Sequence, residues 1–386
     1  MHHLRQKQHQ ELTALTSSRQ LAAFTMIRST RRTGALSLWL LFSMPVLLML
    51  GFFGINALWM NFARAQTQRV VDASALAAGI VMVDDAMLTG EPKLLASLET
   101  IGESAAVNYA TIRNPVSPAP VVFENADYVF SLIDHPLDTQ SPKTLKLIDS
   151  LELTGRRTAA TKNAVPLFGQ GLFSLSQVDV IATSKVKLDR QVAGFRPVFG
   201  NTIPVAPIAI SESDAMSGWK ETIESAWSVS PPTTVAALPT IKITIGGSAT
   251  ADPYVLTVSM SSDPAAQTLN GIAPADLASF GGQLIVPIAG NLPIAGTQSA
   301  PSGLAAALQT LQASGARRAF PLYSGLDGTG QPQVTRFVAA RVTNVVDNGS
   351  TLDVTLTPAF LEHPSVVTET GRPTNPYLAR VRLTTP

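Results

Sequence analysis

The sequence contains no cysteine, which excludes disulfide bonds and any chemistry that depends on a thiolate. Histidine is scarce as well. Of five histidines, His2, His3 and His9 lie at the start of the chain, leaving His135 and His363 for the rest. Zinc and similar metals are bound mainly by cysteine and clustered histidine. We therefore expect no metal, no cofactor and no enzymatic activity.

Charge is missing from one long stretch. Residues 36–59 form a run of 24 residues without a single charged side chain. A helix of that length extends roughly 36 Å and covers a hydrocarbon core of about 30 Å with some tilt. Trp39 and Trp59 stand roughly 30 Å apart on such a helix, where aromatic residues meet the two membrane surfaces. We predict one transmembrane helix over 36–59.

A cleaved signal peptide is the alternative, because Ala63-Arg64-Ala65 has the small-x-small pattern of a cleavage site. The apolar run is about twice the usual length for a signal peptide, so a retained anchor is favoured. Pro45 is tolerable inside a membrane helix, where neighbouring groups satisfy the freed carbonyl. Asn56 is interpreted as snorkelling to the nearby interface, with a partner-helix contact as the alternative.

The distribution of charge predicts the orientation. The tail, residues 1–35, has six basic residues and one acid, Glu11, and basic segments stay cytoplasmic. The tail is expected to touch anionic lipid. Residues 60–386 carry 26 acidic and 22 basic residues and lack a basic stripe, so no nucleic-acid partner is expected.

Residues 60–115 have helical periodicity and are predicted to form a stalk. Apolar side chains from Val70 to Met87 recur at spacings of three and four, and Thr89-Gly90 ends that helix. Pro92 suits the first turn of a second helix, which ends at Asn114-Pro115. The two helices predict an antiparallel hairpin. Its alanine-rich face is expected to pack internally, with self-association or a pilin-like partner as the alternative.

From residue 116 onward the apolar period changes from that of a helix to that of a strand. The pattern predicts a β-rich domain at 116–227, a Pro/Thr/Ser-rich linker at 228–240 and a second β-rich domain at 241–386. Asp347-Asn348-Gly349-Ser350 is a strong hairpin signal. The expected fold class is α+β: one transmembrane helix, a helical hairpin stalk and a mainly β extracytoplasmic body.

The region around the anchor combines basic residues, a glycine, an apolar span with a proline, and an aspartate that leads into Ala-Leu-Ala-Ala. In this order the residues resemble the N-terminal region of the TadE/TadG-like Flp (type IVc) pilus-assembly family, over residues 31–79. That family usually has an aspartate where this chain has Asn56. The anchor and motif residues are Arg31, Arg32, Gly34, Trp39, Pro45, Asn56, Trp59, Ala63, Arg64, Ala65, Gln68, Asp72, Ala73, Leu76, Ala77 and Ala78.

The resemblance implies an accessory of a machine that exports filaments for surface attachment. The protein would lie in the bacterial inner membrane as a single-pass protein, with its N-terminus cytoplasmic and its body periplasmic or extracellular. Its partners would be other pilus-assembly membrane proteins or pilins. Asp72-Ala73-Ser74-Ala75-Leu76 lacks the last serine of a von Willebrand A metal site, and Trp39 replaces the glutamate required after Gly34 for prepilin cleavage.

A few residues suggest other chemistry. Asp134, His135 and Asp138 could offer three metal ligands, but a turn after a strand explains them at least as well. Residues 324–330 lack the spaced acids of a calcium loop and are interpreted as a hairpin. A histidine-dependent serine triad would need His135 or His363, and no Gly-x-Ser-x-Gly elbow accompanies them.

The alternative function is a membrane-tethered hydrolase or sugar-binding module that uses the same type of anchor. Glu221 and Glu224 could form a carboxylate pair, and Trp219 and Trp227 lie close to them in the sequence. An ordinary amphipathic helix explains these four residues better.

Overall fold

The structure is a computed structural model that describes residues 33–112, 120–168, 176–213, 218–247, 253–259 and 263–384. Contacts divide the chain into two units. The first unit comprises Met1–Ala63 and Val165–Val178, and the second comprises Arg64–Ala164 and Asp179–Pro386. Each unit is described separately below.

The longest element is the helix α2 (Thr33–Val81), which contains the whole predicted span 36–59 and Pro45. It belongs to the first unit up to Ala63 and to the second unit from Arg64. The helix ends at Val81, short of the predicted Met87. A 3-10 helix (Asp85–Leu88) follows it, and the Asp84 carboxylate accepts the Ala86 N–H at 3.0 Å as its cap.

The helix α3 (Pro92–Ile112) begins at the predicted proline, after Gly90 with φ +65°. It comes close to the end of α2 at Gly102, where a Cβ would lie 2.8 Å from Cγ of Met82, the residue after α2, and 3.8 Å from Cβ of Ala78 within it. From Arg64 onward α2 also packs on strands: a Cβ on Gly79 would lie 3.0 Å from Val186. The helices therefore contact a sheet as well as each other, and the separate hairpin stalk stays a prediction.

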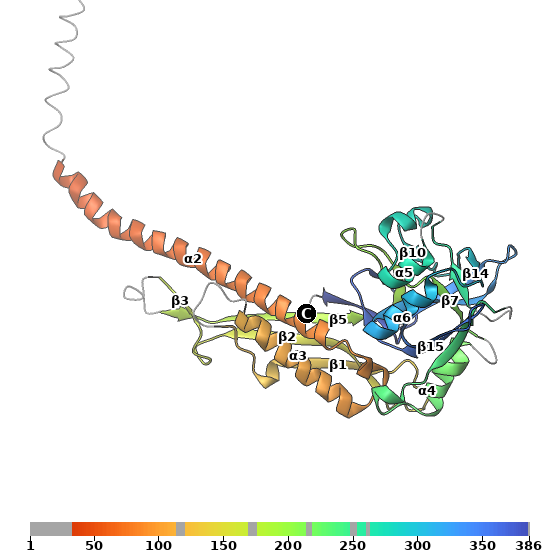
Figure 1. Cartoon of the computed structure of the whole chain (residues 1–386). Coiled ribbons are helices and arrows are strands. Elements are labelled where there is room, and N and C mark those ends of the chain that lie inside the picture. Colours follow the sequence, from red (N-terminus) through yellow and green to blue (C-terminus); the bar gives the residue numbers. More distant parts are fainter. Residues whose placement is uncertain are drawn as a thin grey trace, which may run out of the picture. The chain divides into compact units, whose positions relative to one another are not determined.

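A five-stranded sheet in the second unit accompanies α3, and Figure 1 shows α3 beside β1 and β2. Neighbouring strands are antiparallel except β16 and β18. In spatial order the strands are β1 (Tyr128–Asp134), β2 (Lys146–Arg157), β5 (Val180–Asp189), β18 (Leu378–Thr384) and β16 (Leu361–Glu362).

A larger, eight-stranded sheet is the second main sheet of the second unit. Its long hairpin, β14 to β15, turns at the predicted Asp347–Ser350, where the Asn348 N–H donates to the Thr351 carbonyl at 2.9 Å and Gly349 has φ +84°. The order is β12 (Gly296–Thr297), β9 (Tyr254–Leu256), β7 (Ile208–Ser211), β13 (Arg317–Leu326), β14 (Pro332–Asp347), β15 (Leu352–Pro358) and β8 (Ile241–Ile245), with β11 (Leu292–Pro293) beside β14.

Smaller elements complete the fold. The helix α6 (Leu304–Ser314) is closed by Gly315 in the left-handed conformation, as the sequence predicts, and packs on β14 and α5. A three-stranded sheet joins β10 (Leu284–Ile285), β6 (Val192–Phe195) and β17 (Val366–Thr368). The others are α4 (Ser225–Val229), α5 (Pro264–Asn270), a π-helix (Lys220–Glu224), 3-10 helices Asn125–Asp127, Val235–Ala237 and Pro274–Phe280, and the pair β3 (Val165–Pro166) and β4 (Gln177–Val178).

A mainly β body after one long apolar helix is thus confirmed. The two predicted β-rich regions share a sheet, because β18 pairs with β5 over Arg380–Asp189 to Thr384–Lys185. The domain boundaries at 116–227, 228–240 and 241–386 stay predictions.

Candidate functional site

The apolar half of α2 exposes its side chains around the whole helix. Trp39 is 76% exposed and Leu58 72%, and Phe42, Leu47 and Phe53 are also exposed. A helix that is apolar on all sides needs an apolar environment. Among the described residues, this is the one helix long and apolar enough to cross a membrane.

Asn56 is a buried polar residue in the first unit. Its side chain is only 8% exposed because it pairs with the backbone of Phe168. The Phe168 N–H donates to Oδ1 of Asn56 at 2.8 Å, and Nδ2 of Asn56 donates to the Phe168 carbonyl at 3.1 Å. One amide side chain thus satisfies both polar groups of one backbone residue.

Trp59 makes a second attachment one turn further along α2. Its indole N–H donates to the Pro166 carbonyl at 2.9 Å, and its ring lies edge-on to Phe168 at 5.5 Å between centroids. Phe62 also stacks on Trp59, with 5.9 Å between ring centroids. The β3–β4 segment, defined here as residues 165–168 and 176–178, is therefore held to α2 by Asn56 and Trp59.

In the second unit, Gln68 and Asp72 connect α2 to β5. Nε2 of Gln68 donates to Oδ1 of Asp72 at 2.8 Å and to the Thr183 carbonyl at 2.9 Å. Beside them is an open hollow of about 540 Å³, lined in part by Arg64 and Asp179. Arg64 and Ala65 are exposed.

The alanine-rich segment of α2 packs closely. Ala75 and Ala78 are fully buried together with Val71 and Ser74, while Ala73, Leu76 and Ala77 are half-buried. Small side chains let α2 approach its neighbours, as the contact of Gly79 with Val186 shows. The segment therefore serves packing within the chain.

These helical residues coincide with a known sequence family. Residues 34–84 match a family model described as "Putative Flp pilus-assembly TadE/G-like". The match ends just after α2 and includes Asn56, Trp59, Gln68 and Asp72. We call residues 34–84 the Tad segment. No curated protein and no solved structure matches the chain.

Two of the sequence-predicted site residues, Asn56 and Trp59, contact the same partner, the β3–β4 segment. Two others, Gln68 and Asp72, contact each other. Trp39 and Pro45 lie on the exposed part of α2, and Ala63 is buried. Arg31 and Arg32 lie outside the described residues, and of Gly34 only its place in the helix is described.

The candidate catalytic residues have structural partners. His135 is buried and stacks on Trp227 at 4.1 Å, and its Nδ1 accepts the Leu137 N–H at 3.2 Å. Burial, then the nearby Arg190, lowers the pKa of His135 to about 3. The Asp138 carboxylate accepts backbone N–H groups of Gln140, Thr144 and Leu145, each at 2.9 Å. These contacts make a structured turn.

His363 contacts a serine close in the sequence, with 2.7 Å between its Nδ1 and Oγ of Ser365. Ser365 is only 2% exposed, so its hydroxyl is not accessible to a substrate. The Ser365 N–H also donates to Nδ1 of His363, as in a local turn.

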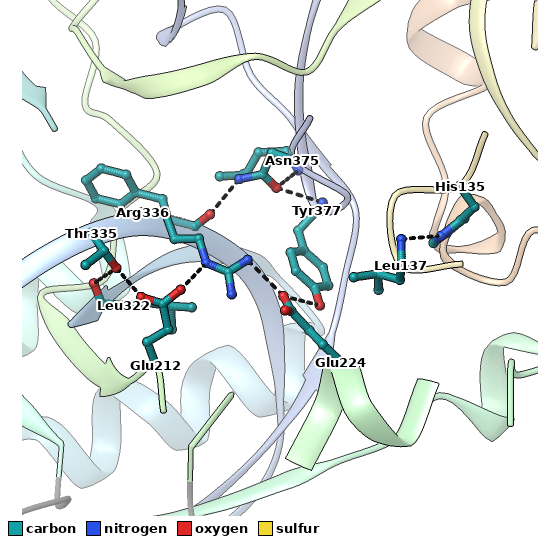
Figure 2. A network of polar contacts seen from close by, with 11 residues as sticks. His135, Leu137, Glu212, Glu224, Leu322, Thr335, Arg336, Asn375 and Tyr377 are labelled. Carbon is teal, nitrogen blue, oxygen red and sulfur yellow. Dashed lines mark hydrogen bonds and ion pairs between the residues drawn. The ribbon is translucent and has the colours of Figure 1, made fainter. Parts of the chain in front are cut away.

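A partly buried polar network includes Glu224, one of the two carboxylates that the alternative function requires. Figure 2 shows Arg336 between Glu212 and Glu224, with nitrogen–oxygen distances of 2.8 Å to each. The Tyr377 hydroxyl donates to Glu224 at 3.2 Å. Burial is the largest single influence on Arg336 and opposes its charge, but the hydrogen bond and charge of Glu224 together with the charge of Glu212 outweigh it and raise the pKa of the guanidinium. Trp219 and Trp227 are buried and unavailable to stack on a sugar.

Asp85 is a buried charge that no pattern in the sequence predicts. The carboxylate of Asp85 accepts the Phe360 N–H at 2.8 Å and pairs with Arg317 at 3.3 Å and with Arg341. Burial raises the pKa of Asp85 despite these partners. Its partners lie more than 200 residues away along the chain, so no local pattern indicates them.

Proposed function

We propose that the protein is a membrane-anchored structural or accessory component of a Tad/Flp pilus-assembly apparatus. The observation that supports this best is the coincidence of the Tad segment with an exposed apolar helix. In this proposal α2 spans the inner membrane, the N-terminal tail is cytoplasmic and the body lies outside. The protein acts in filament assembly and surface attachment.

The proposed chemistry is protein–protein contact. β1 is an edge strand of the five-stranded sheet, with Val129 and Leu132 exposed on it. Edge strands offer unpaired backbone groups to another chain. We propose that this edge engages a pilin or another assembly protein, and that the lipid-facing part of α2 offers a further surface for partner helices or a second copy.

Photo-crosslinking in the pilus-producing host tests the contact. A crosslinking residue replaces Leu132 on β1 in the full-length protein, and a matched control replaces Val229, which is 85% exposed on α4. Adducts with pilus-assembly proteins at position 132 and not at position 229 support the proposal. Identical adducts at both positions, or adducts only with unrelated proteins, would contradict it.

Orientation has its own test, made simple by the absence of cysteine. The variant Val229→Cys carries a single thiol on the exposed surface of the body. A membrane-impermeant maleimide should label it in intact spheroplasts as fully as after permeabilisation. Labelling only after permeabilisation would place the body in the cytoplasm and refute the proposed topology.

A further inference from the structure

Polar backbone groups of the β3–β4 segment have hydrogen-bond partners within the protein, as surroundings with little water require. The Pro166 carbonyl receives the Trp59 indole N–H, and the Leu167 N–H donates to the Ser176 carbonyl at 3.0 Å. The side chain of Asn56 accepts a hydrogen bond from the Phe168 N–H and donates one to the Phe168 carbonyl. In water these backbone groups would be solvated without protein partners, whereas in lipid each one that lacks a partner destabilises the protein.

The side chains of the same segment are also suited to surroundings with little water. The sequence from Asn163 to Val178 holds no charged residue, in contrast to Lys162 and Asp179 on either side. Phe168 is 47% exposed, and Pro166 is exposed too. Phe168, Trp59 and Phe62 form one aromatic cluster on the apolar surface of α2. Tryptophan side chains such as Trp59 concentrate where hydrocarbon meets water.

We infer that the β3–β4 segment is a second membrane-contacting element, which lies in the bilayer interface beside the Trp59 end of the transmembrane helix. The occupant of its apolar surface is lipid, because that surface continues the exposed surface of α2 without a charged boundary. This inference rests on the proposed anchoring of α2.

The geometry assigns a specific role to the amide of Asn56. An amide can donate to the Phe168 carbonyl and accept from its N–H at the same time, whereas a carboxylate can only accept. An aspartate at this position would face the carbonyl oxygen with a negative charge. Asn56 thus holds the segment against the helix through two hydrogen bonds that an ionised aspartate could not both make.

Depth-dependent fluorescence quenching of the full-length protein in phosphatidylcholine vesicles tests the inference. An environment-sensitive fluorophore is attached to Phe168→Cys, to Leu48→Cys within the apolar helix, or to Val229→Cys on the body. We expect quenching at position 168 to be stronger with a nitroxide near the headgroup than with one at the end of the acyl chain. Position 48 should show the reverse preference, and position 229 little quenching.

The outcomes separate this inference from the anchor itself. Quenching at 48 but no more at 168 than at 229 would overturn the inference and leave the anchor standing. Absence of quenching at 48 would overturn both. With the label at 168, Asn56→Asp should lower the quenching there, whereas Asn61→Asp, the same change at an exposed position of α2, should leave it unchanged. Equal effects of the two variants would refute the role of Asn56.

Discussion

Gly155 on β2 lies so close to α2 that a Cβ built on it would stand 2.3 Å from Cγ2 of Val71. The same Cβ would lie 2.8 Å from Val121, so neither neighbour leaves room for a methyl group. We expect Gly155→Ala to destabilise the second unit by roughly 1–3 kcal/mol, the usual cost of overpacking a core. Thermal unfolding of the detergent-solubilised protein should show a lower midpoint.

Gly325→Ala is the matched control, because a Cβ at Gly325 meets no atom within 4 Å and the residue has no positive φ. It should change the stability by less than about 0.5 kcal/mol. Equal midpoints for the two variants would show that the contact between Gly155 and Val71 is not as tight as described.

The sequence predicts the local elements of this fold better than their partners. The uncharged run 36–59 lies inside α2, and Pro92 and Gly315 mark helix ends where expected. Periodicity did not predict the break after Val81, because apolar residues continue at helical spacing to Met87. The pattern predicts a β-rich region at 116–227 but not which strands pair there: β2 lies between β1 and β5 in the sheet.

The candidate site was only half predictable. A polar amide in an apolar span marks Asn56 as unusual, but its partner Phe168 lies 112 residues away and is bound through its backbone. A partner that bonds through its backbone cannot be recognised from the type of its side chain. The ion pairs of Asp85 and of Glu212 and Glu224 with arginines of later strands are equally remote in the sequence.

His135 should make the stability of the second unit sensitive to acid. Its pKa falls from an ordinary 6.5 to about 3 because burial, and then Arg190, disfavours the imidazolium, although Asp138 opposes them. Between those two pH values the unfolded chain binds a proton that the folded chain does not. The contribution of His135 to the free energy of unfolding is therefore complete above pH 6.5 and falls by roughly 1.4 kcal/mol for each pH unit between pH 6.5 and about pH 3.

Urea unfolding at a series of pH values measures this dependence. His135→Asn should give a shallower slope between pH 6.5 and pH 3 than the original chain, even if its stability at neutral pH is lower. His363→Asn removes a less buried histidine and should flatten the slope to a smaller extent. An unchanged slope in His135→Asn would mean that the imidazole is protonated in the folded protein.

Arg336 should be more important than any exposed ion pair. Replacing it with methionine leaves Glu212 and Glu224 facing each other without a counter-charge. Loss of one partner from a buried pair costs roughly 3–5 kcal/mol, and less here because Arg336 is partly exposed. Arg336→Lys should recover only part of the loss, since an ammonium cannot reach both carboxylates with the fork of a guanidinium.

Arg382→Lys provides the comparison, because Arg382 pairs with Asp189 at 2.8 Å while half-exposed. Exposed pairs contribute about 0–1 kcal/mol, so this variant should unfold close to the original midpoint. If Arg336→Lys were equally harmless, the bridging geometry would contribute nothing to stability.

The anchor itself is tested at Gly54 and Leu58, whose replacement disturbs no packing within the described protein. A Cβ on Gly54 meets no atom within 4 Å, and Leu58 is 72% exposed. Any effect of Gly54→Asp combined with Leu58→Asp must therefore come from the surroundings of the helix. An aspartate costs about 2.5–3.5 kcal/mol at the centre of a membrane helix and less towards the interface, where Leu58 lies; the two together should make the protein leave the membrane fraction or be degraded. Phe199→Asp, at a position fully exposed on the body, should fractionate normally. Unchanged membrane fractionation of the double variant would show that hydrocarbon does not surround α2.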